Sequence, residues 1–193
     1  MIYVSLDLET TGLNPEVNSI LEMGAVCDNL AELKPLNELK TFQVYFDLRS
    51  ATFDFQAAIM NTDILKKIDA VRQGREPGAL IKPDDFVVRF KAWLEDCGID
   101  TRFGFTPAGK NFAGFDLQYL RRLPGWREQI RIKQRSIDPA SHFWRPGDLQ
   151  LPTLQQCIDR AGICTAVAHT SVSDAMDVVR LVRKALCGWE ESK

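Results

Sequence analysis

The opening residues of the chain combine a short apolar strand with two carboxylates and a turn. Alternate positions are apolar, which is the period of a β-strand: Ile2, Val4, Leu6 and Leu8. A Thr-Thr-Gly sequence with Asn-Pro just beyond it ends the strand in a turn. Asp7 and Glu9 are two residues apart, so on a strand both point to the same face, with Cα atoms roughly 6.5 Å apart.

Two carboxylates this close at the end of a buried strand repel each other and are costly to remove from water. A divalent cation between them removes both costs, because Mg²⁺ prefers carboxylate oxygens and keeps waters that a substrate can replace. Asp7 and Glu9 alone also fit a simpler interpretation, in which solvated acids line the outer face of an edge strand. The residues downstream bear on this choice.

Length and charge limit the classes of protein to consider. The 193 residues suffice for one domain with a full core, so we expect a single domain over 1–193. A net charge of −2 argues against a broad electrostatic grip on nucleic acid, but it permits an enzyme that holds a few nucleotides through metal ions.

The chain shows no pattern of export or membrane insertion. No apolar run approaches the roughly 20 residues that span a bilayer, and the N-terminus has no basic leader. The five cysteines are scattered without a Cys-x-x-Cys pair, so neither structural zinc nor a disulfide scaffold is indicated. We therefore expect reduced thiols, a cytoplasmic protein and no membrane partner.

Strand patterns precede helix patterns along the chain. Further strands are predicted at 19–27 and 42–48, which with the first would form an antiparallel meander. Beyond these, strands are predicted at 103–108 and 131–137. Helices are predicted around 64–68 and at 83–98, 115–122, 153–161 and 171–186. This order indicates an α/β or α+β fold, with a mixed sheet and helices packed on it.

Three further residues are candidates for chemistry, each with an ordinary alternative. Asp116 starts a predicted helix after a strand, where it is a ligand or a plain first-turn acid stabilising the helix by about 0.3–1 kcal/mol. Asp174 is a ligand or the acid of a capping box with Ser171. His169, one of two histidines, is a catalytic base or an unremarkable residue before a helix.

Taken together, these residues have the order and type found in the DEDDh 3′–5′ exonuclease superfamily, which the chain resembles. The resemblance covers the stretches 5–13, 20–26, 108–116, 154–163 and 169–175, and it is weakest over 30–82 and 123–152. The second motif differs from the family pattern in two ways. Lys110 occupies a position where His is frequent, and the spacing from Asn111 to Asp116 is one residue longer than in many proofreading members.

The resemblance implies an RNase H-like fold, a mixed five-stranded sheet whose first three strands are antiparallel, flanked by α-helices. It also implies two Mg²⁺ or Mn²⁺ ions held by four carboxylates: Asp7, Glu9, Asp116 and Asp174. Two such ions stabilise both oxygens of an in-line displacement at phosphorus. His169 would then take a proton from the attacking water, and nucleoside 5′-monophosphates would leave the 3′ end of DNA or RNA.

Substrate contacts are expected mainly at the first turn and the second motif. The backbone of the turn would approach the terminal 3′-OH, since glycine permits a tight turn, and side chains beyond it would meet the last nucleotide. These residues are Thr10, Thr11, Gly12, Leu13, Asn111 and Phe115. Phe112 and Phe115 are candidates for base stacking and equally for the core.

Two functional classes share this resemblance. One is an active exonuclease on nucleic-acid 3′ ends; the other is a catalytically silent module that binds nucleic acid or protein. Four converging carboxylates have no evident purpose in a pure binding module, which favours the enzyme. Homodimerisation, a replication or RNA-processing partner, and the choice between DNA and RNA all stay open.

Overall fold

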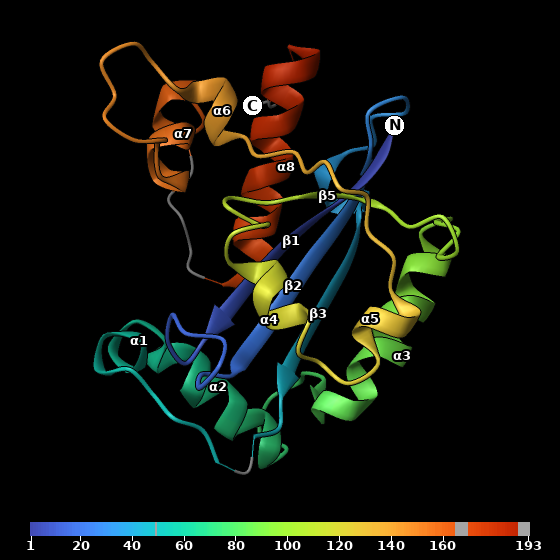
Figure 1. Ribbon diagram of the computed structural model, residues 1–193, viewed down its shortest axis with the longest axis vertical. Coiled ribbons are helices and arrows are strands. Elements are labelled where there is room, and N and C mark those ends of the chain that lie inside the picture. Colours follow the sequence, from blue (N-terminus) through green and yellow to red (C-terminus); the bar gives the residue numbers. More distant parts are fainter. Residues whose placement is uncertain (49, 165–169, 189–193) are drawn as a thin grey trace.

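A mixed five-stranded sheet organises the computed structural model, which describes residues 1–48, 50–164 and 170–188 (Figure 1). The strand order is β4-β3-β2-β1-β5, and the strands are β1 (Ile2–Thr10), β2 (Ile20–Asn29), β3 (Lys40–Phe46), β4 (Leu80–Ile81) and β5 (Thr106–Ala108). β1, β2 and β3 pair antiparallel, whereas β5 runs parallel to β1 and β4 parallel to β3. The expected α/β class with three antiparallel strands is confirmed.

Helices cover both faces of this sheet (Figure 1). Their bounds are α1 (Phe55–Met60), α2 (Thr62–Arg72), α3 (Pro83–Asp96), α4 (Asp116–Leu120), α5 (Trp126–Gln129), α6 (Ala140–Phe143), α7 (Leu154–Ala161) and α8 (Ser171–Cys187), with a 3₁₀ turn at Leu36–Glu38. None of the helices in the described ranges is both long enough and apolar enough to cross a membrane.

One face of the sheet holds a dense aromatic core beneath α3. Phe86 and Phe90 of that helix stack with ring centroids 5.4 Å apart, and both pack on Phe42 and Trp126. Val4, Leu6 and Leu8 from β1 belong to the same buried cluster. The alternation of β1 thus directs its apolar side chains towards α3.

The opposite face is covered by α8, which packs on β1 and β2. Its valines at 178, 179 and 182 join Tyr3 and Val26 in a second buried cluster. Next to it, the Arg183 guanidinium forms a fork with Asp28, at 3.0 Å from Nε and 2.6 Å from Nη2, and the Tyr3 hydroxyl donates to the same carboxylate. These contacts fix α8 along the sheet.

The predicted strand at 131–137 is wrong as an element. Only isolated bridges form there, Phe105 with Ile132 and Ala108 with Ile137. The residues between the two bridges, 133–136, are polar and mostly exposed, so they have no apolar face to bury against the sheet. β5 is also shorter than predicted and covers three residues, Thr106–Ala108.

Candidate active site

The carboxylates of Asp7 and Glu9 lie on the α8 face of β1. Their neighbours Leu6 and Leu8 are buried in the aromatic core on the other face, so strand alternation turns both acids away from that core. The two acids are half-buried. Their placement on one face matches the prediction from the sequence.

The first turn of α8 brings Asp174 to the same place. Single oxygens of Asp7, Glu9 and Asp174 lie within 4.8 Å of one another. The helix approaches this closely because Gly24 faces it: a Cβ atom there would lie 2.3 Å from the backbone of Ser171 and Val172. Gly24 pairs with Asp7 in the β1–β2 register, so the missing side chain leaves room beside the first carboxylate.

Asp116 completes the acidic group from a different element. It is the first residue of α4 and only 3% exposed. The Leu8 backbone N–H, which lies between Asp7 and Glu9 in the sequence, donates to Asp116 Oδ1 at 3.1 Å. That hydrogen bond attaches the start of α4 to β1, so Asp116 is more than a solvated acid in a first helical turn.

Crowding and burial make these acids hard to ionise without a cation. Burial, followed by the charges of Asp116 and Asp174, raises the pKa of Asp7 well above its usual range. Burial and the same kind of repulsion, led by Asp174, raise the pKa of Glu9 to about 8. Burial raises the pKa of Asp116 to about 7, although hydrogen bonds from its own N–H and that of Leu8 oppose the rise.

A fifth acid, Glu22, belongs to this site and was not among the predicted residues. It is 1% exposed and pairs with Glu9 across β1 and β2. Its carboxylate accepts hydrogen bonds from Gln43 Nε2 and, at 3.3 Å, from the Ser171 N–H at the start of α8. A glutamate inside the apolar run of β2 was the sequence signal that could have indicated it.

The Ser171 contact also tests the capping-box interpretation of Asp174. In a capping box the Asp174 carboxylate would accept from the Ser171 N–H, but that N–H donates to Glu22. The helix instead starts after Thr170, whose side chain makes no cap hydrogen bond. The first turn of α8 is therefore attached to the sheet through Glu22. The other member of the third motif, His169, lies outside the described residues.

The turn after β1 is tied together by its own side chains. Thr10 Oγ1 donates to the Gly12 carbonyl at 2.6 Å, and Thr11 Oγ1 donates to the Thr52 carbonyl at the same distance. A Cβ atom on Gly12 would lie 2.1 Å from Asp54 Oδ2, so the position admits only glycine without rearrangement. Leu13, directly beyond, is 80% exposed.

The second motif is connected to this turn through Tyr119. Asn111 has a φ of 56°, and its N–H donates to Asp138 Oδ2 at 2.9 Å. Phe112 is 2% exposed and belongs to the core, which leaves it no free face for stacking. Phe115 is half-buried against Tyr119, whose hydroxyl donates to the Gly12 carbonyl at 2.7 Å.

Several solved structures with the same fold are nucleases. Cell-death related nuclease 4 (CRN-4) superimposes with a TM-score of 0.67 at 14% identity, over 97% of this chain and 64% of its own. Exonuclease I from Methylocaldum szegediense gives 0.62 at 16% identity, over 96% and 41%. The chain has the fold of these enzymes. The zinc-bound complex of E. coli exonuclease I with single-stranded DNA gives 0.62 at 15% identity, over 96% and 41%.

Sequence comparisons add nothing to this result. No protein-family model matches the chain, and no curated protein matches it by sequence. The chain spans about two fifths of the exonuclease I chains, 41% in both structures above. The likeness is therefore one of fold.

Proposed function

We propose that the protein is a metal-dependent 3′–5′ exonuclease that releases nucleoside 5′-monophosphates from single-stranded or short DNA or RNA. The observation that carries this proposal is the convergence of Asp7, Glu9 and Asp174 within 4.8 Å on a fold shared with exonuclease I. Two half-buried acids of β1 and the buried Asp174 of α8 seldom converge this closely without a cation to neutralise them.

The donor set fits hard divalent cations. All of the groups that converge are carboxylates, which suit Mg²⁺ or Mn²⁺ better than soft metals. Asp7, Glu9 and Asp174 would hold one ion, and Asp7 with Asp116 would hold a second. When bound, such ions supply a water of lowered pKa and stabilise negative charge at the phosphate.

The chain's own residues would do the remaining work. Leu8 holds Asp116 in place through its N–H, and Glu22 holds the first turn of α8 and hence Asp174. We assign to His169 the proton of the attacking water, because a neutral imidazole is the side chain suited to that role near pH 7.

The proposed substrate is the 3′ end of a nucleic-acid strand. The exposed Leu13 and the backbone from Thr10 to Gly12 are assigned to the terminal nucleotide, together with Asn111 and the half-buried ring of Phe115. A structural neighbour, E. coli exonuclease I, binds single-stranded DNA, which supports this class of ligand.

Shortening of labelled strands tests the proposal. Single-stranded RNA, single-stranded DNA and a duplex with a recessed 3′ end, each labelled at the 5′ end, are incubated with Mg²⁺ or Mn²⁺. We expect stepwise shortening from the 3′ end that Asp7→Ala and His169→Ala abolish. Asp63→Ala, at a side chain 93% exposed in α2, is the matched control and should retain full activity.

The opposite outcome has an equally definite meaning. If no substrate is shortened in a metal-dependent way and Asp7→Ala is indistinguishable from the parent, the protein is not an exonuclease. The result would then support a catalytically silent binding module on the same fold.

A further inference from the structure

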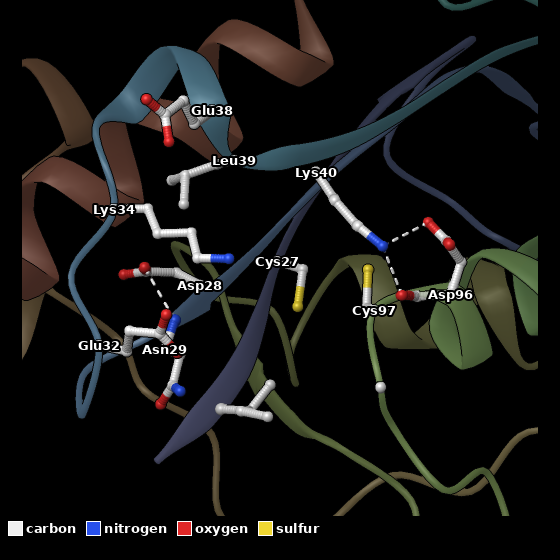
Figure 2. A pocket seen from close by; sticks show the side chains of 12 residues that line it. Cys27, Asp28, Asn29, Glu32, Lys34, Glu38, Leu39, Lys40, Asp96 and Cys97 are labelled. Carbon is white, nitrogen blue, oxygen red and sulfur yellow. Dashed lines mark hydrogen bonds and ion pairs between the residues drawn. The ribbon is translucent and has the colours of Figure 1, made fainter.

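A pocket of about 310 Å³ lies at the other end of the central strands from the carboxylates. Figure 2 shows the side chains that line it. It is lined by Cys27 of β2, by Lys40 of β3, and by Cys97 and Gly98, which follow α3. Cys27 pairs with Val4, near the start of β1, whereas Asp7 and Glu9 lie near the end of the same strand. The proposed nuclease function leaves this pocket unexplained.

An ion pair lies beside the two cysteines of the pocket. Lys40 pairs with Cys27 across β2 and β3, and its ammonium contacts both Oδ2 and the carbonyl of Asp96, at 2.8 and 2.5 Å. Cys97 follows Asp96 directly and caps α3. Figure 2 shows the two thiols in the wall of the pocket, beside the Lys40 ammonium.

The two thiols lie next to each other (Figure 2) and are chemically unequal. Interaction with the neighbouring Cys97 thiol, supported by the charge of Lys40, lowers the pKa of Cys27 against the opposing effects of burial and Asp28. The same interaction, together with burial, raises the pKa of Cys97. This is the division of roles in a reactive dithiol, in which one sulfur attacks as a thiolate and its neighbour resolves the product as a thiol.

We propose that Cys27 and Cys97 form a peroxide-reactive dithiol that closes to a reversible disulfide. The Cys27 thiolate attacks one oxygen of hydrogen peroxide, which breaks the O–O bond, gives a sulfenic acid and releases hydroxide. Cys97 sulfur then attacks the sulfenic sulfur, and the S–S bond forms as water leaves. In total two thiols lose two electrons and two protons to one peroxide, which yields two waters.

The position of the pair separates it from the proposed nuclease site. Cys27 and Cys97 pack against the aromatic core under α3, whereas Asp174 and α8 cover the opposite face of the sheet. Both thiols are half-buried, so a small oxidant reaches them through the open pocket. Cys157 is buried, and Cys164 and Cys187 are exposed, which makes these three the internal controls.

The test is oxidation of the folded protein in a Cys164→Ser/Cys187→Ser background, which prevents bridges between chains at exposed thiols. After treatment with hydrogen peroxide, we expect an intact mass about 2 Da lower than that of the reduced protein and, after alkylation of the remaining thiols and digestion, a cross-linked peptide pair containing Cys27 and Cys97. Dithiothreitol should restore both thiols. Adding Cys27→Ser or Cys97→Ser should abolish the loss of mass, whereas adding Cys157→Ser should leave it unchanged.

A second measurement needs no cysteine substitution at the pair. Phenylarsine oxide bridges two neighbouring thiols, and we expect the reduced background protein to bind one equivalent and lose reactivity at both Cys27 and Cys97. Either of two results would overturn the proposal: stable addition of oxygen to Cys27 without linkage to Cys97, or no arsenical bridge in the folded protein. Neither result depends on whether the protein degrades nucleic acid.

Discussion

Glu9→Gln isolates the energetic cost of the acidic cluster, because glutamine keeps the shape of the side chain and removes its charge. Burial and the neighbouring acids, led by Asp174, raise the pKa of Glu9 from 4.5 to about 8 in the folded protein. Between these pH values the unfolded chain has released the proton and the folded chain still holds it. Stability therefore falls as pH rises from about 4.5 to about 8.

The pKa shift sets an upper limit on this cost. A difference of one pKa unit corresponds to about 1.4 kcal/mol, so the shift of Glu9 corresponds to about 4–5 kcal/mol at pH 8. Glu9 is only half-buried, and solvent screening reduces the figure. We expect the metal-free Glu9→Gln variant to be more stable than the parent by about 2 kcal/mol at pH 8 and by under about 1 kcal/mol at pH 5.

Urea unfolding with EDTA at both pH values measures the difference. Glu128→Gln, at an exposed position in α5, is the matched control and should change neither value. Adding Mg²⁺ at about 100 times its dissociation constant should stabilise the parent by about 2.7 kcal/mol and the Glu9→Gln variant by much less. A variant that is less stable than the parent by the same amount at pH 5 and pH 8 would refute the reasoning.

Three further substitutions test separate parts of the structure. Gly24→Ala places a methyl group against the start of α8, so we expect about 1–3 kcal/mol of destabilisation in urea and at least about a tenfold loss of strand shortening. Gly12→Ala meets the Asp54 carboxylate and distorts the turn assigned to the 3′ end; KM for single-stranded oligonucleotides should rise more than kcat falls. Asp28→Ala leaves Arg183 charged and buried, which should cost about 3–5 kcal/mol in urea unfolding with little change in kcat at a temperature where the variant stays folded.

Strands β1 to β3 and the longer helices could be predicted because their apolar residues follow the period of the element. Period-two alternation in β1 places Leu6 and Leu8 in the core and fixes the direction of Asp7 and Glu9. Helix α7 lies where the sequence predicts a helix, at 153–161, and the structure shows a capping box of Thr153 and Gln156 at its start and Gly162 at its end. Patterns within one segment are therefore enough to predict whether that segment forms a strand or a helix.

The missing parts depend on contacts between distant segments. Glu22 reads locally as one acid in an apolar strand, and only the packing of α8 shows that its carboxylate meets the Ser171 N–H. Cys27 and Cys97 are 70 positions apart, and they become neighbours because α3 packs on the sheet so that both lie against the same core. Neither the contact between Glu22 and Ser171 nor the proximity of Cys27 and Cys97 can be predicted from a period or a spacing along the chain.

Glu22 also explains how the start of α8 is held close to the three other acids of the site. The positive end of the α8 dipole points at the cluster, and its first N–H is satisfied by a carboxylate of the sheet. The same glutamate adds negative charge beside Glu9, so the contact that positions Asp174 also raises the cost of an empty site. The aromatic core beneath α3 lies on the other face of β1 and stabilises the fold independently of this charge. The acidic end of the α8 face can therefore be held in an unfavourable electrostatic state that a cation would relieve, while the aromatic core and the apolar cluster under α8 keep the protein folded.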